Sequence, residues 1–218
     1  VDTTPPVTAL VVGAPQFRLP DGMLLVSSRT PLSLPAGDPT AGGVASGLRE
    51  TLYRVFDAPN SSGTFGPFTT PFTLTRPDAL KTTEFFSRDK VANTEAAKSS
   101  TVLLDSTPPE LALFSPPACI AGICRVLKGR FPVLGTAQDI HLRDYQLEFA
   151  QGKDAVTGFK RISSATVNVA TGTLGVWDTG ALRGFHTLRL TGTDLVENVA
   201  SLQLNVFVGD PGELMTLG

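Results

Sequence analysis

The sequence predicts an all-β protein made of two tandem β-sandwich domains. Three observations support this prediction: short runs that alternate apolar and polar residues, turn-forming residues between those runs, and a set of motifs that occurs twice. Glycine and proline are frequent, with 21 and 17 copies in 218 residues, which suits many short strands joined by turns. No stretch of ten or more residues has the apolar spacing of an amphipathic helix.

Strand-like segments are clearest in the second half of the chain. Four of them alternate apolar and polar residues, at 145–149, 166–170, 186–192 and 201–208. The first half has comparable segments, such as TLYRVF and STVLLD, separated by the turn-rich stretches PAGDPTAGG and DAPNSSGTFGP. Short strands with this spacing are typical of β-sandwiches.

Four motifs occur in the same order in both halves. DTTPP returns as DSTPP, LPAGD as GTAQD, ETLYRVF as RDYQLEF, and DKVAN as DLVEN. Such an ordered recurrence indicates an internal duplication. We therefore predict one domain at 1–105, a second at 106–210, and a tail or the start of a further linker at 211–218. Because the linker motif also opens the sequence, we expect a preceding domain in a longer protein.

The predicted linker consists of Asp105, Ser106, Thr107, Pro108 and Pro109. Two consecutive prolines fix φ and favour an extended chain, so the linker is expected to be a short, semi-rigid spacer. Its Asp and Thr side chains can bond to nearby backbone amides. In D-x-V-x-N the same chemistry can close a turn, with the valine predicted to point inward.

These motifs resemble the immunoglobulin-like repeats of bacterial extracellular proteins. The shared pattern includes Y-R-V, P-F-T-L, D-x-x-x-N-x-E and the closing D-x-T-P-P, and the second half resembles a sister pattern with Y-x-L-E and W-D-T. Ala92 and Glu197 stand where the pattern has glycine, which predicts turns of a different type, and His186 replaces a tyrosine. The resemblance implies a non-catalytic module of a secreted or cell-surface protein.

Charge and motifs argue against several classes of function. The net charge of −2 gives no basic surface for nucleic acid, and the apolar runs are too short to span a bilayer. The two histidines, His141 and His186, are not accompanied by a G-x-S-x-G elbow, and H-E-x-x-H and phosphate loops are absent from the sequence. We therefore predict that the chain is not an enzyme.

Calcium is the cation that best fits the acidic loops. Asp89, Asn93 and Glu95 precede the last strand of the first domain, and Asp105 lies in the linker. Oxygen ligands from a loop and a linker could meet at one end of the domain and hold a hard cation. The alternative is that these side chains only close turns. No other cofactor is expected.

The single tryptophan, Trp177, could stack on a sugar or pack inside the second sandwich. Tyr53 and Tyr145 are placed at matching positions of the two repeats, which indicates a structural role. Cys119 and Cys124 are expected to form a disulfide, because their number is even in a repeat that resembles secreted ones. Half of a metal site or two free thiols are the alternatives.

The predicted function is that of a structural or adhesive module outside the cell, acting as a stalk, fibre or protein-interaction unit. Its expected partners are neighbouring modules, copies of itself, or a surface protein or glycan. The alternative is an accessory pair of domains that binds glycan or protein beside a catalytic domain. The bases in QFR and FKRI are suited to protecting edge strands. The tail Glu213–Gly218 either adds as a strand to a partner or is only a linker.

Overall fold

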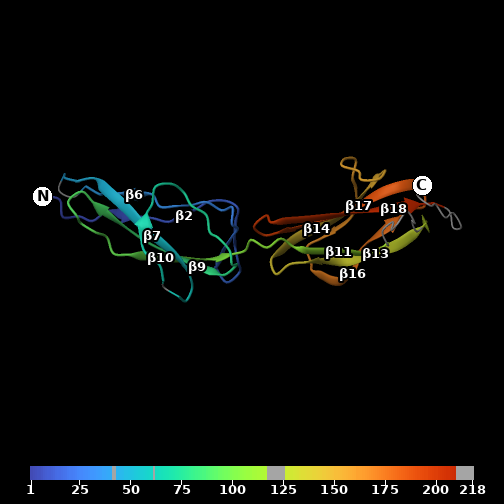
Figure 1. The fold of residues 1–218 in the computed structure, drawn as a ribbon, viewed down its shortest axis with the longest axis horizontal. Coiled ribbons are helices and arrows are strands. Elements are labelled where there is room, and N and C mark those ends of the chain that lie inside the picture. The colour runs from blue at the N-terminus through green and yellow to red at the C-terminus, as the bar shows by residue number, and fades with distance from the viewer. Residues whose placement is uncertain (41–42, 61, 117–125, 210–218) are drawn as a thin grey trace. The chain divides into compact units, whose positions relative to one another are not determined.

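The structure is a computed structural model that describes residues 1–40, 43–60, 62–116 and 126–209. All regular elements in these residues are strands (Figure 1), so no helix among them could cross a membrane. The chain divides into two compact units, Val1–Thr107 and Pro108–Gly218. Each unit is a sandwich of two β layers, and the predicted fold class is confirmed.

In the first unit, the larger sheet has the strand order β3-β4-β10-β9-β7-β8. These strands are β3 (Gln16–Arg18), β4 (Leu24–Val26), β7 (Leu48–Asp57), β8 (Gly66–Pro67), β9 (Leu80–Asp89) and β10 (Lys98–Leu104). The opposite layer is formed by two short pairs, β1 (Val7–Thr8) with β6 (Ala36–Gly37) and β2 (Val11–Val12) with β5 (Leu32–Ser33). A bridge from Leu32 to Phe72 extends this layer.

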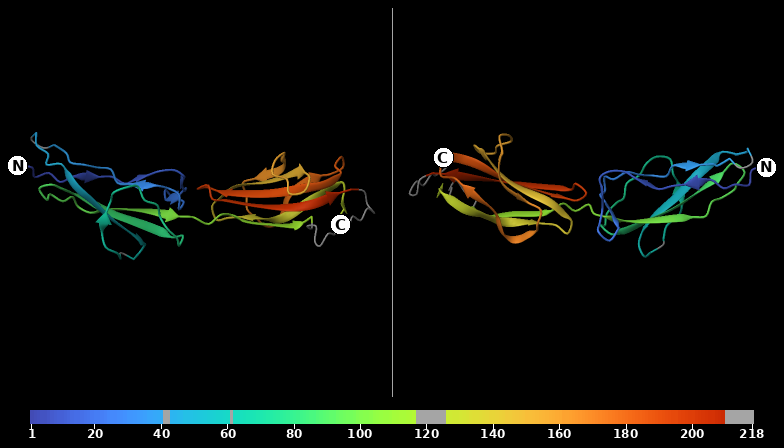
Figure 2. Two further views of the ribbon diagram at one scale, coloured as in Figure 1. Left: turned by 45° about the horizontal axis from the view of Figure 1, so that its top comes forward. Right: turned by 180° about the vertical axis from the view of Figure 1, so that it is seen from behind.

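In the second unit, the larger sheet has the order β12-β18-β17-β14-β15 and the smaller one the order β11-β13-β16. The larger sheet contains β12 (Val126–Leu127), β14 (Leu142–Gln151), β15 (Lys160–Ala165), β17 (Gly184–Asp194) and β18 (Val199–Val208). The smaller sheet contains β11 (Glu110–Ser115), β13 (Arg130–Gln138) and β16 (Val169–Asp178). Figure 2 shows both sandwiches from two further sides.

The two units repeat the same strand pairing. β4, β10, β9, β7 and β8 correspond in order to β12, β18, β17, β14 and β15, and the first pair of each series is parallel. Leu48 faces Asp89 in the first unit, as Leu142 faces Asp194 in the second. The motifs DKVAN and DLVEN are therefore structurally equivalent.

The predicted correspondence of the two tyrosines is wrong by two residues. Thr51 faces Ser87, and Tyr145 faces Gly192. Since Ser87 and Gly192 are equivalent, Tyr145 corresponds to Thr51 and not to Tyr53. An offset of two keeps both tyrosines on the inner face of their strands, so sequence similarity alone could not distinguish the two registers.

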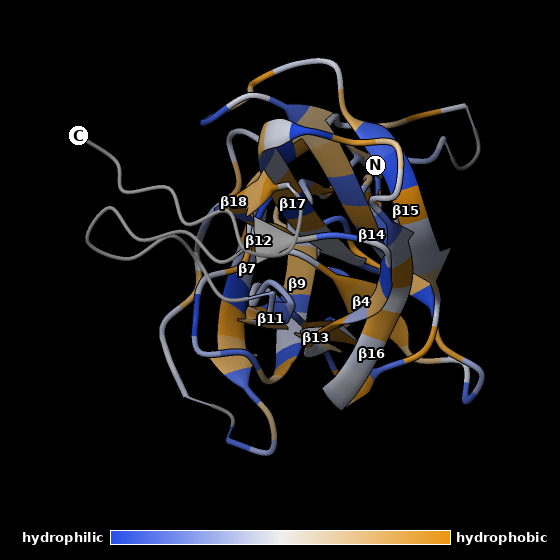
Figure 3. Ribbon diagram, turned by 90° about the vertical axis from the view of Figure 1, so that its right-hand side faces the viewer, coloured by the Kyte–Doolittle hydropathy of each residue, from blue (hydrophilic) through white to orange (hydrophobic). Residues whose placement is uncertain are grey.

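Each unit has its own apolar core between its sheets. The first is centred on five buried residues: Val26, Leu32, Leu74, Val102 and Leu104. The second is larger and includes Trp177 and Tyr145 together with leucines and valines from both sheets. Apolar and polar residues alternate along the strands (Figure 3), as expected for strands that face a core on one side only.

Two predicted edge strands are confirmed. β3 and β15 lie at the edges of the two larger sheets, and Arg18, Lys160 and Arg161 are exposed on them. Charged side chains on an edge disfavour pairing with a further strand.

Candidate functional site

The turn between β9 and β10 is held by the side chain of Asp89. Its Oδ1 accepts the backbone N–H of Val91 at 3.0 Å and that of Asn93 at 2.8 Å, and its Oδ2 accepts Nδ2 of Asn93 at 2.7 Å. Asp89 is fully buried, and these hydrogen bonds compensate for the loss of water around its charge. The turn-closing role predicted for D-x-V-x-N is confirmed.

The turn between β17 and β18 has the same geometry. Asp194 Oδ1 accepts the N–H of Val196 at 2.9 Å and of Asn198 at 2.8 Å, and Asp194 Oδ2 accepts Nδ2 of Asn198 at 2.7 Å. Val196 is fully buried, as predicted, but its counterpart Val91 is 55% exposed. The prediction that this valine points inward is therefore confirmed for the second unit and wrong for the first.

Ala92 and Glu197 adopt the left-handed conformation that usually belongs to glycine. Their φ angles are 73° and 65°, and their amides donate to the carbonyl oxygens of Asp89 and Asp194, each at 3.3 Å. The prediction of different turn types is therefore wrong. The aspartate hydrogen bonds hold both turns in one conformation although neither position carries glycine.

We expect Glu197→Gly to stabilise the second unit by about 1 kcal/mol, since a side chain in the left-handed region costs roughly that much. Urea unfolding followed by the fluorescence of Trp177 would measure this, because that tryptophan is the only one in the chain. Glu197→Ala is the matched control: it keeps a side chain in the left-handed region, so it should not give the stabilisation expected of Glu197→Gly. Equal effects of the two variants would contradict a role for backbone strain.

Three carboxylates meet at the end of the first unit that contains this turn. One oxygen each of Asp2, Asp38 and Asp89 lies within 4.8 Å of the others. Asp2 accepts the N–H of Ser46 at 2.7 Å, and Asp38 accepts that of Gly47 at 2.6 Å. Oxygen ligands of this kind suit calcium, and backbone N–H groups already bind part of each carboxylate. In the first unit, this group could hold a cation.

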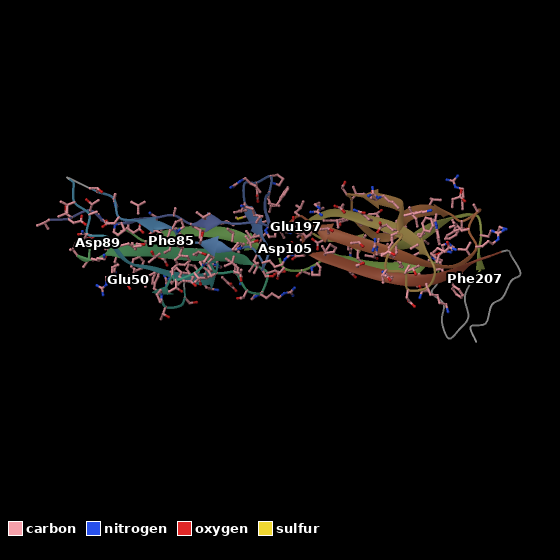
Figure 4. The ribbon with its side chains drawn as sticks, turned by 90° about the horizontal axis from the view of Figure 1, so that it is seen from above. Glu50, Phe85, Asp89, Asp105, Glu197 and Phe207 are labelled. Atoms are coloured by element: carbon pink, nitrogen blue, oxygen red, sulfur yellow. The ribbon has the colours of Figure 1, made fainter. Side chains whose placement is uncertain are left out.

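The predicted calcium site does not form from the residues chosen for it. Of Asn93, Glu95 and Asp105, only Asn93 contacts Asp89. Asp89 and Asp105 lie at opposite ends of the first unit (Figure 4), because the ten residues of β9 separate the two ends by about 30 Å. A linker residue C-terminal to β10 cannot reach a turn N-terminal to it. The equivalent linker residue at that end is Asp2.

Glu95 belongs to a buried polar network instead. It accepts the amide of Ser87 at 2.9 Å, the amide of Thr8 at 3.2 Å and the ammonium of Lys98 at 2.7 Å. The hydroxyl of Ser87 also bonds to that of Thr51 at 2.8 Å. This network ties β1, β7 and β9 to the start of β10.

In the second unit the same place is apolar. Gly192 corresponds to Ser87, and a Cβ atom there would lie 2.9 Å from the side chain of Leu111. Tyr145, which corresponds to Thr51, is buried in the core. The two repeats therefore use hydrogen bonds and apolar packing, respectively, at equivalent positions.

Acid should destabilise the first unit. Burial raises the pKa of Glu95, but hydrogen bonds from Lys98 and Thr8 outweigh it, and the pKa lies below its ordinary value of 4.5. For Asp89, hydrogen bonds from Asn93 likewise outweigh burial and lower the pKa below 3.8. A lowered folded-state pKa stabilises the protein above the unfolded-state value, and this contribution disappears as the pH falls through the folded-state value.

We therefore expect the first unit to keep its stability from neutral pH down to about pH 5 and to lose it progressively below that. Amide NMR signals of Thr8 and Ser87, recorded in urea at a series of pH values, would measure this. Glu95→Gln is expected to lower stability at neutral pH and to reduce the acid dependence. A free energy of unfolding that stays constant down to pH 3, which is about one unit below the ordinary range of these groups, would contradict the prediction.

A cross-strand ion pair occurs in both units with its charges exchanged. Arg54 on β7 contacts Glu84 on β9 at 2.6 Å, whereas Glu148 on β14 contacts Arg189 on β17 at 2.7 Å. The registers make Arg54 equivalent to Glu148. In each unit a phenylalanine ring lies against the arginine. Sequence reasoning missed this pair, because the register is needed before complementary charges can be matched.

The first residues of the linker are fixed to the first unit. Arg76 Nη2 donates to the carbonyl oxygen of Ser106 at 2.6 Å, and Asp78 accepts the hydroxyl groups of Ser106 and Thr107. The N–H of Thr107 donates to Asp105 Oδ1 at 3.2 Å, and Thr4 bonds to Asp2 in the same way at 3.0 Å. The predicted side-chain bonding of the Asp in this motif is thus observed twice.

Trp177 cannot serve as a platform for sugars, because only 2% of its surface is exposed. Its ring packs against Phe131, Phe149 and His186, with centroid distances of 5.8, 5.3 and 6.0 Å. The packing interpretation is confirmed, and the sugar-stacking interpretation is wrong for this residue. The alternation of β16 places Trp177 on its inner face.

In the described residues, no catalytic arrangement accompanies His186. His186 is buried against Trp177, and its Nδ1 lies 3.1 Å from the carbonyl oxygen of Gly184. A surface hollow of about 410 Å³ beside β14 and β15 is lined by Asp144, Gln146 and residues 164–167, without a histidine or an activated nucleophile. Cys119, Cys124 and the tail Glu213–Gly218 lie outside the described residues.

No protein-family model and no curated protein matches this chain. Solved structures with a similar arrangement include the fibronectin(III)-like modules of CbhA from Clostridium thermocellum, at 12% identity and a TM-score of 0.43, covering 92% of this chain and 94% of that one. A tetra-tandem repeat from the extending region of a large adhesion protein matches at 17% identity and a TM-score of 0.36, covering 93% of this chain and 50% of the other.

Extracellular cadherin domains 3–6 of protocadherin gamma B2 match at 16% identity and a TM-score of 0.28, covering 96% of this chain and 51% of theirs. The chain thus spans about half the length of the adhesion repeat and of the cadherin fragment. The fold assignment given above depends on the strand pairing of this chain itself.

Proposed function

We propose that this chain is a non-catalytic pair of immunoglobulin-like modules that acts as a stalk, fibre or protein-interaction unit of a secreted or cell-surface bacterial repeat protein. The observation that supports this proposal most directly is the path of the chain. In each unit, the chain enters at one end of the sandwich and leaves at the other. Modules of this kind can be joined in series and can transmit tension.

In the first unit, the chain enters beside Asp89, where Asp2 accepts a hydrogen bond from Ser46. It leaves at the opposite end, where the N–H of Asp105 donates to Val26 at 2.9 Å. The last strand, β10, runs along the sheet towards this exit and pairs with both β9 and β4. Tension along the chain would therefore pull β10 along its own axis.

The second unit has the same path. Glu110 faces Gln138 near the Asp194 end, and Val208 faces Gly184 at the other end. Ten residues of β18 face ten residues of β17. Pulling β18 lengthwise requires these hydrogen bonds to break together, which resists force better than breaking them one after another.

Force spectroscopy on single molecules tests the proposal. We expect the second unit to unfold at a several-fold higher force when it is pulled between the two ends of the chain than when it is pulled between a handle at Arg183 and the C-terminal end. The second geometry separates β17 from β18 at the Gly184–Val208 pair and opens the hairpin one bond at a time. Equally low forces in both directions would contradict a tension-bearing role.

The extracellular location is part of the same proposal. It is supported by the sequence resemblance and by the expectation that Cys119 and Cys124 are bonded to each other, since such bonds persist in oxidising compartments. Intact mass of secreted protein should rise by about two hydrogens on reduction. Quantitative alkylation of both thiols without reductant would argue against the bond and the location. Trp177 does not support the alternative role in glycan binding, because its side chain is buried.

A further inference from the structure

The outer edge of β18 is largely unpaired in the described part of the second unit. One side of β18 pairs with β17 along ten residues. On its other side, the described residues pair with it only at Phe207 and Val208, through β12. From Val199 to Val206, no described strand pairs with the outer edge.

The hydrogen-bonding groups that point outward can be identified. The amide of Asp194 donates to the carbonyl oxygen of Asn198 at 3.1 Å, so these two form a hydrogen-bonded pair of the hairpin. In an antiparallel pair, hydrogen-bonded and non-hydrogen-bonded positions alternate. Ala200, Leu202 and Leu204 therefore bond to β17, and the N–H and C=O groups of Ser201 and Gln203 point away from the sheet.

Four other sheet edges in the described part of the chain carry protective features. β3 carries Arg18, β15 carries Lys160 and Arg161, and β8 contains Pro67, all of which disfavour strand addition. β11 has an irregular register between Leu113 and Ser115, which interrupts a regular edge.

β18 has none of these protective features. Its sequence, VASLQLNVFV, contains no charge and no proline over ten residues. Val199 is 56% exposed, and Leu202 and Leu204 are half-buried at the rim of the core. A long, uncharged, regular edge is the surface that an additional strand fits.

We propose that this edge binds the β18 edge of a second copy of the chain, in an antiparallel arrangement centred on Leu202. The pairing places Ser201 opposite Gln203 of the second copy and Leu202 opposite Leu202, so no like charges meet and an apolar pair forms on the core side. The same surface is used by both copies, and the contact closes after two chains. This inference names a partner for the adhesive part of the proposed function and rests on it.

The first test is Gln203→Pro. Proline removes the outward N–H of residue 203, which has no partner in the described structure, and leaves the bonds between β17 and β18 intact. Sedimentation equilibrium of the full chain should show weak dimerisation, as expected for a small interface. In Gln203→Pro the association constant should fall by about tenfold to a hundredfold, because two hydrogen bonds are lost per dimer. Gln203→Ala keeps the N–H and should associate like the wild type.

A second variant tests the same contact without a proline substitution, so that impaired folding of Gln203→Pro cannot be mistaken for a lost contact. Ser201→Lys combined with Gln203→Lys places ammonium groups directly opposite each other on the solvent face and should abolish dimerisation at low salt. Ser164→Lys combined with Thr166→Lys is the matched control, since it adds the same charge at exposed positions on and just beyond β15. This control should dimerise normally.

Two outcomes overturn the inference: a wild-type chain that stays monomeric up to about 1 mM, a concentration that detects even very weak association, or a dimer that persists unchanged in the double-lysine variant. The force experiment is carried out on single monomers, so the two proposals can fail independently. A high unfolding force without dimerisation would leave the stalk proposal standing and refute the β18 contact.

Discussion

Trp177→Ala is expected to lower the free energy of unfolding of the second unit by about 3–5 kcal/mol, the usual cost of truncating a large buried aromatic side chain. The indole is 2% exposed and contacts three aromatic rings, so its removal leaves a cavity between the two sheets. A loss of this size is a large part of the stability of an ordinary domain. The second unit should unfold at a much lower temperature or not fold at all.

Differential scanning calorimetry of the full chain measures this effect. The first unit should be unaffected, because the core around Trp177 consists of residues of the second unit only. Trp177→Phe is the control and should cost less, since it retains a ring and removes an indole N–H that has no hydrogen-bond partner in the described residues. A change below about 1 kcal/mol in Trp177→Ala would be incompatible with a buried core position.

Asp194→Ala is expected to destabilise the second unit by about 3 kcal/mol. The carboxylate is fully buried and accepts hydrogen bonds from the amides of Val196 and Asn198 and from the side chain of Asn198. Alanine leaves these donors without their acceptor and also releases Glu197 from its left-handed conformation. The fluorescence of Trp177 during urea unfolding reports on this unit directly.

Asp89→Ala should have an effect of similar size on the first unit, because its turn has the same hydrogen bonds. The exchange Asp194→Asn with Asn198→Asp is a sharp control. It restores the hydrogen bond between the two side chains with reversed polarity, so the exchanged variant should be more stable than Asp194→Ala. If both have the same stability, the side-chain hydrogen bond contributes nothing.

Much of this fold could be predicted from residue patterns. Alternation of apolar and polar residues located β14, β17 and β18, and the repeated motifs located equivalent turns in the two sandwiches. The strand predicted at 166–170 is wrong, because most of that segment is the turn between β15 and β16. The D-x-V-x-N turn was predictable because its hydrogen bonds join residues only two to four positions apart. Hydrogen bonds between residues this close along the chain can be recognised from the residue pattern alone.

The grouping of side chains from distant parts of the chain could not be predicted in this way. The sequence placed Asp89 with Asp105, yet the structure brings it near Asp2 and Asp38. Whether Asp2 or Asp105 lies near the turn after β9 depends on the direction of β9 and on the end of the sandwich at which the chain enters. The exchanged ion pairs, Arg54 with Glu84 and Glu148 with Arg189, likewise depend on strand register.

The sequence by itself therefore determined the all-β class, the repeated turns and the protected edges at Arg18 and at Lys160, because these follow from side-chain periodicity and local hydrogen bonding. Only the tertiary structure decided that Trp177 is buried, that the left-handed turns persist without glycine, and that the outer edge of β18 is unpaired between Val199 and Val206 among the described residues. These properties depend on contacts between strands far apart in the chain, and a one-residue change of register would move each side chain to the other face.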